Sequence, residues 1–217
     1  MSLISALTAK SWMQQSFEDL PAPGRLTIPT AKLGLLFFLA VVTVLFSLLA
    51  TAWSMRMMSG DWRPLPEPPI LWLNTLLLVL SSTALHRSWT AARQNNSTRT
   101  RVGLTIAGIL ALSFLAGQLV AWWQMSGLGY FLATNPANTF FYLLTALHAL
   151  HIAGGMVALA RTGAKLRDRI QLPTLRFSLE LCTLYWHFLL MVWLGLFALM
   201  LSDNDHAWMH QGLHHMH

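Results

Sequence analysis

Charged residues are scarce in this chain: only 10% of its 217 residues are Asp, Glu, Lys or Arg. That share is too small to cover the surface of a soluble protein of this length. Cys182 is the only cysteine, so the chain cannot form an internal disulfide. Walker loops, nucleophile elbows and CxxCH haem-attachment motifs are also absent, which argues against the enzyme classes that these motifs mark.

Hydrophobic residues are abundant instead, at 55% of the sequence, and they gather in long runs. A helix needs about 20 apolar residues to cross a membrane core of about 30 Å. Four runs have that length and a fifth is shorter. The sequence therefore predicts an all-α, polytopic membrane protein, a bundle of five transmembrane helices. The expected spans are Leu33–Trp53, Ile70–Leu85, Val102–Trp123, Thr139–Ala160 and Phe177–Leu201.

The second run, Ile70–Leu85, is the short one. It reaches spanning length only if Pro68 and Pro69 belong to its first turn. Proline is tolerated there because the first N–H groups of a helix have no intrahelical acceptor.

Tryptophans lie near the ends of the runs. An indole ring at the membrane surface buries its apolar body and keeps its N–H hydrated, so we expect these residues to be interfacial anchors. They are Trp53, Trp62, Trp72, Trp89, Trp122, Trp123 and Trp208.

The basic residues fall mostly on one side of the predicted bundle. Twelve of the fourteen lie in the N-terminal segment, between the second and third spans, or between the fourth and fifth. The positive-inside rule therefore predicts a cytoplasmic N-terminus and a periplasmic C-terminus. The net charge of +6 then reflects topology and attraction to anionic lipids, and no nucleic-acid-binding motif accompanies it. The expected parts are a cytoplasmic arm (residues 1–31), a five-helix membrane domain (32–202) and a His-rich periplasmic tail (203–217).

Four polar residues inside the apolar runs are the best candidates for a site. His148 and His151 lie one helical turn apart in the fourth span, and Glu180 and His187 lie two turns apart in the fifth. A short connection makes these two spans antiparallel neighbours, so a carboxylate–imidazole contact between them is expected. Polar side chains in a membrane are costly unless they are paired. We therefore expect these four residues to form a structural polar cluster or a lipid contact.

Other roles for the same residues stay open at this point. A His-x-x-His pair with a glutamate is a partial metal site, although such sites generally recruit a third or fourth ligand. A proton relay is a second alternative. A b-type haem needs two histidines, but His148 and His151 on one helix face cannot easily bind its opposite sides. We predict no catalytic, metal-binding or cofactor-binding residue in the spans.

The C-terminal tail is rich in histidine. If it is helical, His206 and His210 have the spacing to chelate a divalent ion on one face. Histidine-rich termini also bind metals adventitiously, and this is the interpretation that we favour. The residues concerned are His206, His210, His214, His215 and His217.

Small and polar residues within the spans are expected to bring helices together. Hydroxyl and amide side chains in a membrane hydrogen-bond across helices, and glycines allow close backbone approach. The polar residues of the second span are Asn74, Thr75, Ser81 and Ser82, and the glycines are Gly103, Gly108, Gly117, Gly154 and Gly155.

Five motifs occur in a fixed order along the spans. They are KLGLLFFLA from Lys32, LWLNTLLLVLSS from Leu71, Gly117-Gln118 ahead of Trp122, FYLLTALHALHIAGG from Phe141, and Glu180 followed by Leu184-Tyr185-Trp186-His187-Phe188. With these motifs, the chain resembles subunit III of the haem–copper terminal oxidases (cytochrome c oxidase subunit 3), in the short five-span form of many bacterial oxidases. The likeness runs from about Lys32 to Ser202.

The chain departs from this family at three acidic positions. The resemblance places the family's membrane glutamate, which reacts with carbodiimides, at Val42. It places a second glutamate at Ala121, and the Val-Asp after Trp-His-Phe at Leu189-Leu190. A proton-antenna role therefore does not carry over, and the chain is expected to belong to a divergent branch.

The resemblance implies an accessory subunit without a cofactor of its own. Its expected partners are subunit I, which holds the haems and copper, reduces oxygen and pumps protons, subunit II, which receives electrons, and phospholipids. The complex would lie in the bacterial inner membrane and take electrons from cytochrome c or quinol. The alternatives are an accessory protein of a nitric oxide reductase and a small transporter, although five spans cannot form an even inverted repeat.

Overall fold

The structure, a computed structural model, describes residues 29–58, 69–131, 135–167 and 172–214 of the chain. It divides into two units, Met1–Leu33 and Gly34–His217. Of the first unit only residues 29–33 are described, and from Thr30 they are helical. The predicted cytoplasmic arm thus lies largely outside the described residues.

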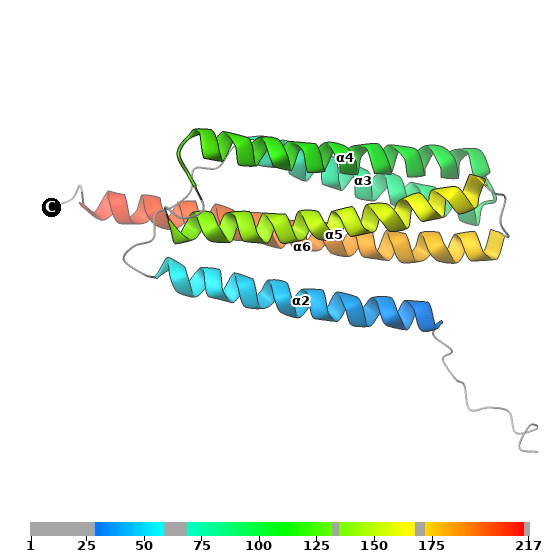
Figure 1. The fold of residues 1–217 in the computed structure, drawn as a ribbon, viewed down its shortest axis with the longest axis horizontal. Coiled ribbons are helices and arrows are strands. Elements are labelled where there is room, and N and C mark those ends of the chain that lie inside the picture. The colour runs from blue at the N-terminus through cyan, green and yellow to red at the C-terminus, as the bar shows by residue number, and fades with distance from the viewer. Residues whose placement is uncertain (1–28, 59–68, 132–134, 168–171, 215–217) are drawn as a thin grey trace, which may run out of the picture. The chain divides into compact units, whose positions relative to one another are not determined.

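Five helices make up the described part of the chain, which contains no strand. All five are long and apolar enough to cross a membrane, so the prediction of a five-helix, all-α membrane protein is confirmed. In Figure 1 they run along a common direction within the second unit. The helices are α2 (Thr30–Met57), α3 (Ile70–Arg93), α4 (Ser97–Gly127), α5 (Pro136–Arg167) and α6 (Leu172–His214).

The second span gains its length at the opposite end from the one we expected. Pro69 is the N-cap of α3, whose first helical residue is Ile70, and Pro68 lies outside the described residues. The helix continues past Leu85 to Arg93. Pro69 has helical dihedral angles, φ −60° and ψ −17°, and its carbonyl oxygen accepts from the Trp72 N–H at 3.3 Å, so it opens the first turn as its cap. The polar C-terminal end of α3 completes the span.

The turn between α3 and α4 joins two closely packed helices. Asn95 adopts a positive φ of 58°, a conformation that asparagine tolerates better than most residues. The side chain of Asn96 then caps α4 by accepting a hydrogen bond from the Arg99 N–H at 3.0 Å. Helices α3 and α4 also lie close together beyond the turn: a Cβ on Gly103 of α4 would lie 2.9 Å from the Ser88 Cβ of α3.

Helices α3 to α6 form a closed set in which each helix packs against two others: α3 on α4 and α6, and α5 on α4 and α6. The predicted antiparallel pairing of the last two spans is confirmed by two hydrogen bonds in opposite chain order: the Tyr185 hydroxyl donates to the His151 carbonyl oxygen at 2.8 Å, and Lys165 Nζ donates to Ser178 Oγ at 3.0 Å. Large side chains fill the interior of this set. Among them are Leu78, Phe114, Leu144, Trp186 and Trp193, all fully buried.

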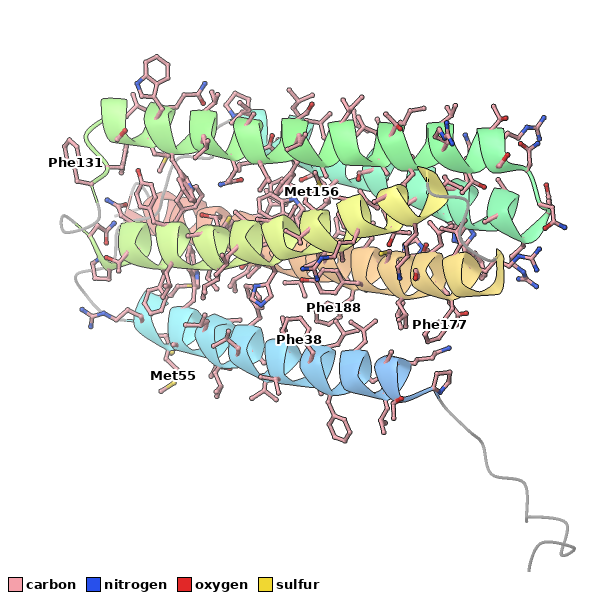
Figure 2. The ribbon with its side chains drawn as sticks, turned by 45° about the vertical axis from the view of Figure 1, so that its right-hand side comes forward. Phe38, Met55, Phe131, Met156, Phe177 and Phe188 are labelled. Atoms are coloured by element: carbon pink, nitrogen blue, oxygen red, sulfur yellow. The ribbon has the colours of Figure 1, made fainter. Side chains whose placement is uncertain are left out.

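Helix α2 is attached in a different way. In the described part of the chain its backbone makes no close approach to the other four helices. Instead, aromatic rings bridge the space: Phe46 lies 5.7 Å from the His151 ring and Phe38 lies 6.2 Å from the Tyr185 ring, measured between centroids. Figure 2 shows Phe38 between α2 and the helices it faces. Bulky side chains therefore hold α2 at a distance.

The tryptophans divide between the surface and the core. Trp72 and Trp123 are exposed, as expected of interfacial anchors. Trp53 is fully buried against the Phe140 ring, 6.1 Å away between centroids, so its prediction as an anchor was wrong. Trp122 is half-buried and donates from Nε1 to Thr145 Oγ1 at 3.0 Å. Trp62 and the side chain of Trp208 lie outside the described residues.

Candidate functional site

His148 lies in the centre of the bundle, fully buried on α5. The Trp193 ring stacks on its imidazole, with centroids 5.2 Å apart and planes 28° apart. Phe46 and Phe114 meet the same ring edge-on, at 6.3 and 5.9 Å. Neither of its ring nitrogens has a hydrogen-bond partner among the described residues. His148 therefore packs as a flat ring among Phe46, Phe114 and Trp193, which we call the aromatic cage. The predicted contact with a carboxylate is not made at His148.

His151 lies one turn further along α5 and faces α2. Its Nδ1 lies 2.7 Å from the carbonyl oxygen of Leu147 in the same helix, which gives the ring a local hydrogen-bond partner. Phe38 and Phe46 of α2 lie 6.0 and 5.7 Å away between ring centroids. His151 thus belongs to the contact that positions α2.

His187, on α6, belongs to a third environment. Its Nδ1 lies 2.8 Å from Ser82 Oγ and its Nε2 lies 3.4 Å from His86 Nδ1, both on α3. Ser82 and His86 are four residues apart, so one face of α3 supplies both partners. The sequence analysis missed His86, which comes just after the predicted end of the second span. The four-residue spacing from Ser82 places both side chains on one helix face and could have identified His86 as a second polar residue there.

Glu180 lies nearer the beginning of α6 and lines an open groove of about 570 Å³. The groove is formed with Trp89, Arg93 and Arg176, and we call these four residues the basic groove. The Arg93 guanidinium lies over the Trp89 ring, 5.2 Å from its centroid. Arg176 donates from Nε to the Ala92 carbonyl oxygen at 3.2 Å. These contacts hold two cations beside a carboxylate and an aromatic ring.

The four predicted site residues thus do not form one polar cluster, although His148 and His151 share a contact with the Phe46 ring. In the ranges that the structure describes, no three His, Cys, Asp or Glu side chains gather in a way that could hold a metal ion. The side chains of the tail histidines lie outside the described residues, although α6 itself continues as a helix to His214. The spacing that the tail prediction requires is therefore present in the backbone.

Hydrogen bonds between helices fulfil the prediction for the second span. The Trp186 indole N–H donates to Ser81 Oγ at 2.9 Å, and the Trp193 indole N–H donates to Thr75 Oγ1 at 2.9 Å. Both bonds join α6 to α3, where an unpaired indole N–H would be costly in a dry interior.

An amide pair links α3 to α4. Asn74 Nδ2 donates to Gln118 Oε1 at 3.4 Å, and both side chains are buried. A Cβ on the neighbouring Gly117 would overlap with Asn74 Oδ1. Glycine at this position is therefore required for the amide of Asn74 to approach α4.

A model of the family "Cytochrome c oxidase subunit III" matches residues 30–202, which include every described span. The chain belongs to the cytochrome c oxidase subunit III family. It is 30% identical over 172 residues to "Cytochrome c oxidase subunit 3" of Synechocystis sp., a match that covers 76% of this chain and 72% of the relative.

Two further relatives from this family extend the comparison. The chain is 29% identical over 173 residues to "Cytochrome c oxidase subunit 3" of Thermostichus vulcanus, covering 77% of this chain and 85% of the relative. It is 28% identical over 179 residues to "Probable cytochrome c oxidase subunit 3" of Mycobacterium bovis, covering 79% and 83%. The resemblance identified from the motifs is thereby confirmed.

The three positions at which the subunit III resemblance expects acids are all apolar and packed. Val42 is 2% exposed, Ala121 is fully buried, and Leu190, which stands where the resemblance expects the aspartate, is half-buried against the core. A carboxylate at any of them would need a partner inside the bundle. Val42 lies one turn before Phe46, the residue that meets the His148 ring, so the face of α2 that lost the glutamate is the face that contacts the aromatic cage.

Proposed function

We propose that this chain is the accessory subunit III of a bacterial haem–copper respiratory oxidase. In this role it packs against subunit I, next to subunit II, and stabilises the catalytic subunit during turnover. The observation that carries the proposal is the family match across all five spans. The haems and copper would lie in subunit I, and this chain would hold no redox cofactor of its own.

The arrangement around His148 supports the proposal that no haem is bound here. A haem ligand needs open space along the axis of its coordinating nitrogen. The rings of Phe46, Phe114 and Trp193 already fill the surroundings of His148, and its neighbour His151 is turned towards α2. These residues stabilise the bundle by packing instead.

Phospholipid is the second partner that we propose, with the basic groove as its headgroup site. Guanidinium groups bind phosphate oxygens through paired N–H donors. Arg93 and Arg176 would contact the phosphate, and Glu180 would contact an amino headgroup. Trp89 is an aromatic side chain of the type that is enriched at membrane surfaces. We place the subunit in the bacterial inner membrane with its N-terminus in the cytoplasm, because twelve of fourteen basic residues then face inside.

The alternatives receive no support from the comparisons. The three relatives described above carry the name cytochrome c oxidase subunit 3, not that of a nitric oxide reductase component. A transporter of the inverted-repeat type uses helices that are broken within the membrane. Each of the five described spans is a continuous helix.

Removal of the subunit tests the proposal directly. The complex is purified from cells with and without this chain, and its haem spectrum and oxygen consumption are followed. Because electron entry and oxygen chemistry lie elsewhere, we expect a normal spectrum and near-normal initial rates without the chain. The depleted complex should then inactivate faster during sustained turnover.

Two results would overturn this function. Loss of a haem band from an otherwise assembled complex would mean that this chain supplies a haem ligand. Recovery of the chain from native membranes by gentle crosslinking without any oxidase subunit would remove the proposed partners. Re-expression of the chain from a plasmid is the control, and it should restore the lifetime of the complex.

A further inference from the structure

His86 lies on α3 one turn before Trp89, which lines the basic groove. Its ring centroid is 5.5 Å from the Trp89 ring, and its Nδ1 lies 3.4 Å from His187 Nε2 on α6. The His86 side chain is exposed, although the residue belongs to a membrane-spanning helix. A polar side chain on the outer face of such a helix is costly unless it finds a partner. The function proposed above does not use His86.

The hydrogen bonds around His187 determine where the proton of His86 lies. Ser82 is buried, and among the described residues the partner of its hydroxyl is His187 Nδ1, at 2.8 Å. A buried hydroxyl proton needs an acceptor, so Ser82 donates to this nitrogen. A neutral His187 then carries its proton on Nε2, which donates to His86 Nδ1. A neutral His86 therefore carries its own proton on Nε2.

This order of donors and acceptors ends at the outside of the bundle. Each group from Ser82 through His187 to His86 accepts a proton from the one before it. The last donor, the Nε2–H of His86, has no acceptor in the part of the chain that the structure describes. Because the His86 side chain is exposed, its acceptor has to come from outside the chain.

The level of His86 along α3 matches the ester layer of a phospholipid. The apolar run of α3 ends at Leu85, and the exposed Arg87 follows His86. Ester carbonyls lie between the phosphate and the hydrocarbon chains, in a polar layer about 5–8 Å thick on each side of the membrane core. The Arg93 guanidinium lies over the Trp89 ring, so a phosphate bound there would be level with Trp89. His86 precedes Trp89 by three residues, about 4.5 Å further into the membrane.

We propose that His86 binds an ester carbonyl oxygen of the phospholipid whose phosphate occupies the basic groove. The ligand is a diacyl glycerophospholipid that is recognised at two levels, its phosphate by Arg93 and Arg176 and its ester carbonyl by the Nε2–H of His86. An ether-linked phospholipid has no ester carbonyl, so it would keep the phosphate contacts and lose the bond to His86. The contact rests on the lipid site proposed above and adds selectivity for ester-linked lipids to it.

Native mass spectrometry of the delipidated, full-length protein tests this selectivity. An equimolar mixture of a diester phosphatidylethanolamine and its diether analogue with the same chains is added, and the first bound lipid is identified by its mass. One hydrogen bond changes an affinity by about 2–10-fold. We expect the wild type to bind the diester in excess by a factor in this range. Inorganic phosphate at the same concentration should displace neither lipid, because it has no ester carbonyl and no acyl chains.

Four variants separate the ester contact from the phosphate contact. His86→Phe keeps an aromatic ring beside Trp89 but has no donor, so it should bind both lipids equally. His86→Gln keeps an amide donor and should recover part of the preference. Arg93→Gln should lower the binding of both lipids without changing their ratio, because it alters only the phosphate contact. His151→Gln changes a half-buried histidine that faces α2 and should keep the wild-type ratio.

The outcomes distinguish failure of the ester contact from failure of the lipid site. Equal binding of the two lipids by the wild type overturns the role of His86 and leaves the lipid site standing. An ester preference that persists in His86→Phe also overturns it, because another group then makes the contact. If the wild type binds neither lipid better than Arg93→Gln does, or if phosphate displaces both, the lipid site itself is overturned together with the ester contact.

Discussion

Gly155 and Gly154 are neighbours on α5, and the structure predicts opposite responses when each is changed to alanine. A Cβ on Gly155 would lie 2.7 Å from Tyr185 Cε1 and 2.9 Å from Trp186 Cζ3. Around Gly154, apart from its chain neighbours and the backbone of its own helix, no described atom lies within 4 Å of the corresponding position. The expectation that both glycines allow close helix approach is therefore confirmed for Gly155 and wrong for Gly154.

The size of the effect follows from the fixed rings of α6. The Tyr185 hydroxyl donates to the His151 carbonyl, and the Trp186 indole donates to Ser81, so neither ring moves aside without weakening a hydrogen bond. Overpacking of this kind costs about 1–3 kcal/mol. Replacing a helical glycine by alanine gains roughly 0.5–1 kcal/mol, but this gain is common to both variants. The difference between them is therefore the packing cost alone.

The assay is thermal and denaturant unfolding of the two variants in the same detergent. For a protein of this size, 1 kcal/mol corresponds to about 2–4 °C in melting temperature. We expect Gly155→Ala to melt about 2–12 °C below Gly154→Ala, with Gly154→Ala at or slightly above the wild type. Equal melting temperatures for the two variants would show that α5 and α6 do not approach as described.

Three other predictions concern topology and acidic groups. Single cysteines at Leu128 and Thr98, both exposed, should differ in labelling by an impermeant thiol reagent: Leu128→Cys should react from the periplasm and Thr98→Cys should not. The native Cys182 is buried and should give little background labelling. The reverse labelling pattern would overturn the predicted orientation. Because Thr30–Met57 contains no acidic residue, mass spectrometry should find no carbodiimide adduct in it, and an adduct there would contradict the assignment of Val42. Glu180→Ala should release the subunit from its complex more readily in detergent than Glu180→Gln, which keeps a hydrogen-bonding amide; equal retention on gel filtration would mean that the basic groove does not need this side chain.

The five spans could be predicted because hydropathy is a local property of the sequence. Their ends could not, because packing determines them. The last turns of α3 contain Ser88 and Ala91, which hydropathy does not mark, yet both are buried. The Ser88 hydroxyl donates to the Thr100 carbonyl at 2.7 Å across the turn to α4. That partner is supplied by the next helix, so a single run of residues does not reveal it.

The candidate site was harder to predict for the same reason. The motifs identified His148, His151, Glu180 and His187 correctly as polar residues within the spans, but a periodic pattern shows only which residues share a face. It does not show that Trp193 stacks on His148, or that Glu180 lies with the arginines of the basic groove. The indole and hydroxyl groups that join α3 to α6 could be predicted as a class, because few other partners exist in a membrane.

The attachment of α2 through rings has a consequence for the order of assembly. Polar bonds and small residues join α3, α4, α5 and α6, and such contacts associate helices after each has inserted into the bilayer. Helix α2 precedes the other four described helices along the chain but offers chiefly aromatic contacts, so we expect it to dock last, onto a set of four helices that is already complete. Such a helix should exchange its amide hydrogens first when detergent replaces lipid. The span that comes first in the described part of the chain would then be the last to reach its native place.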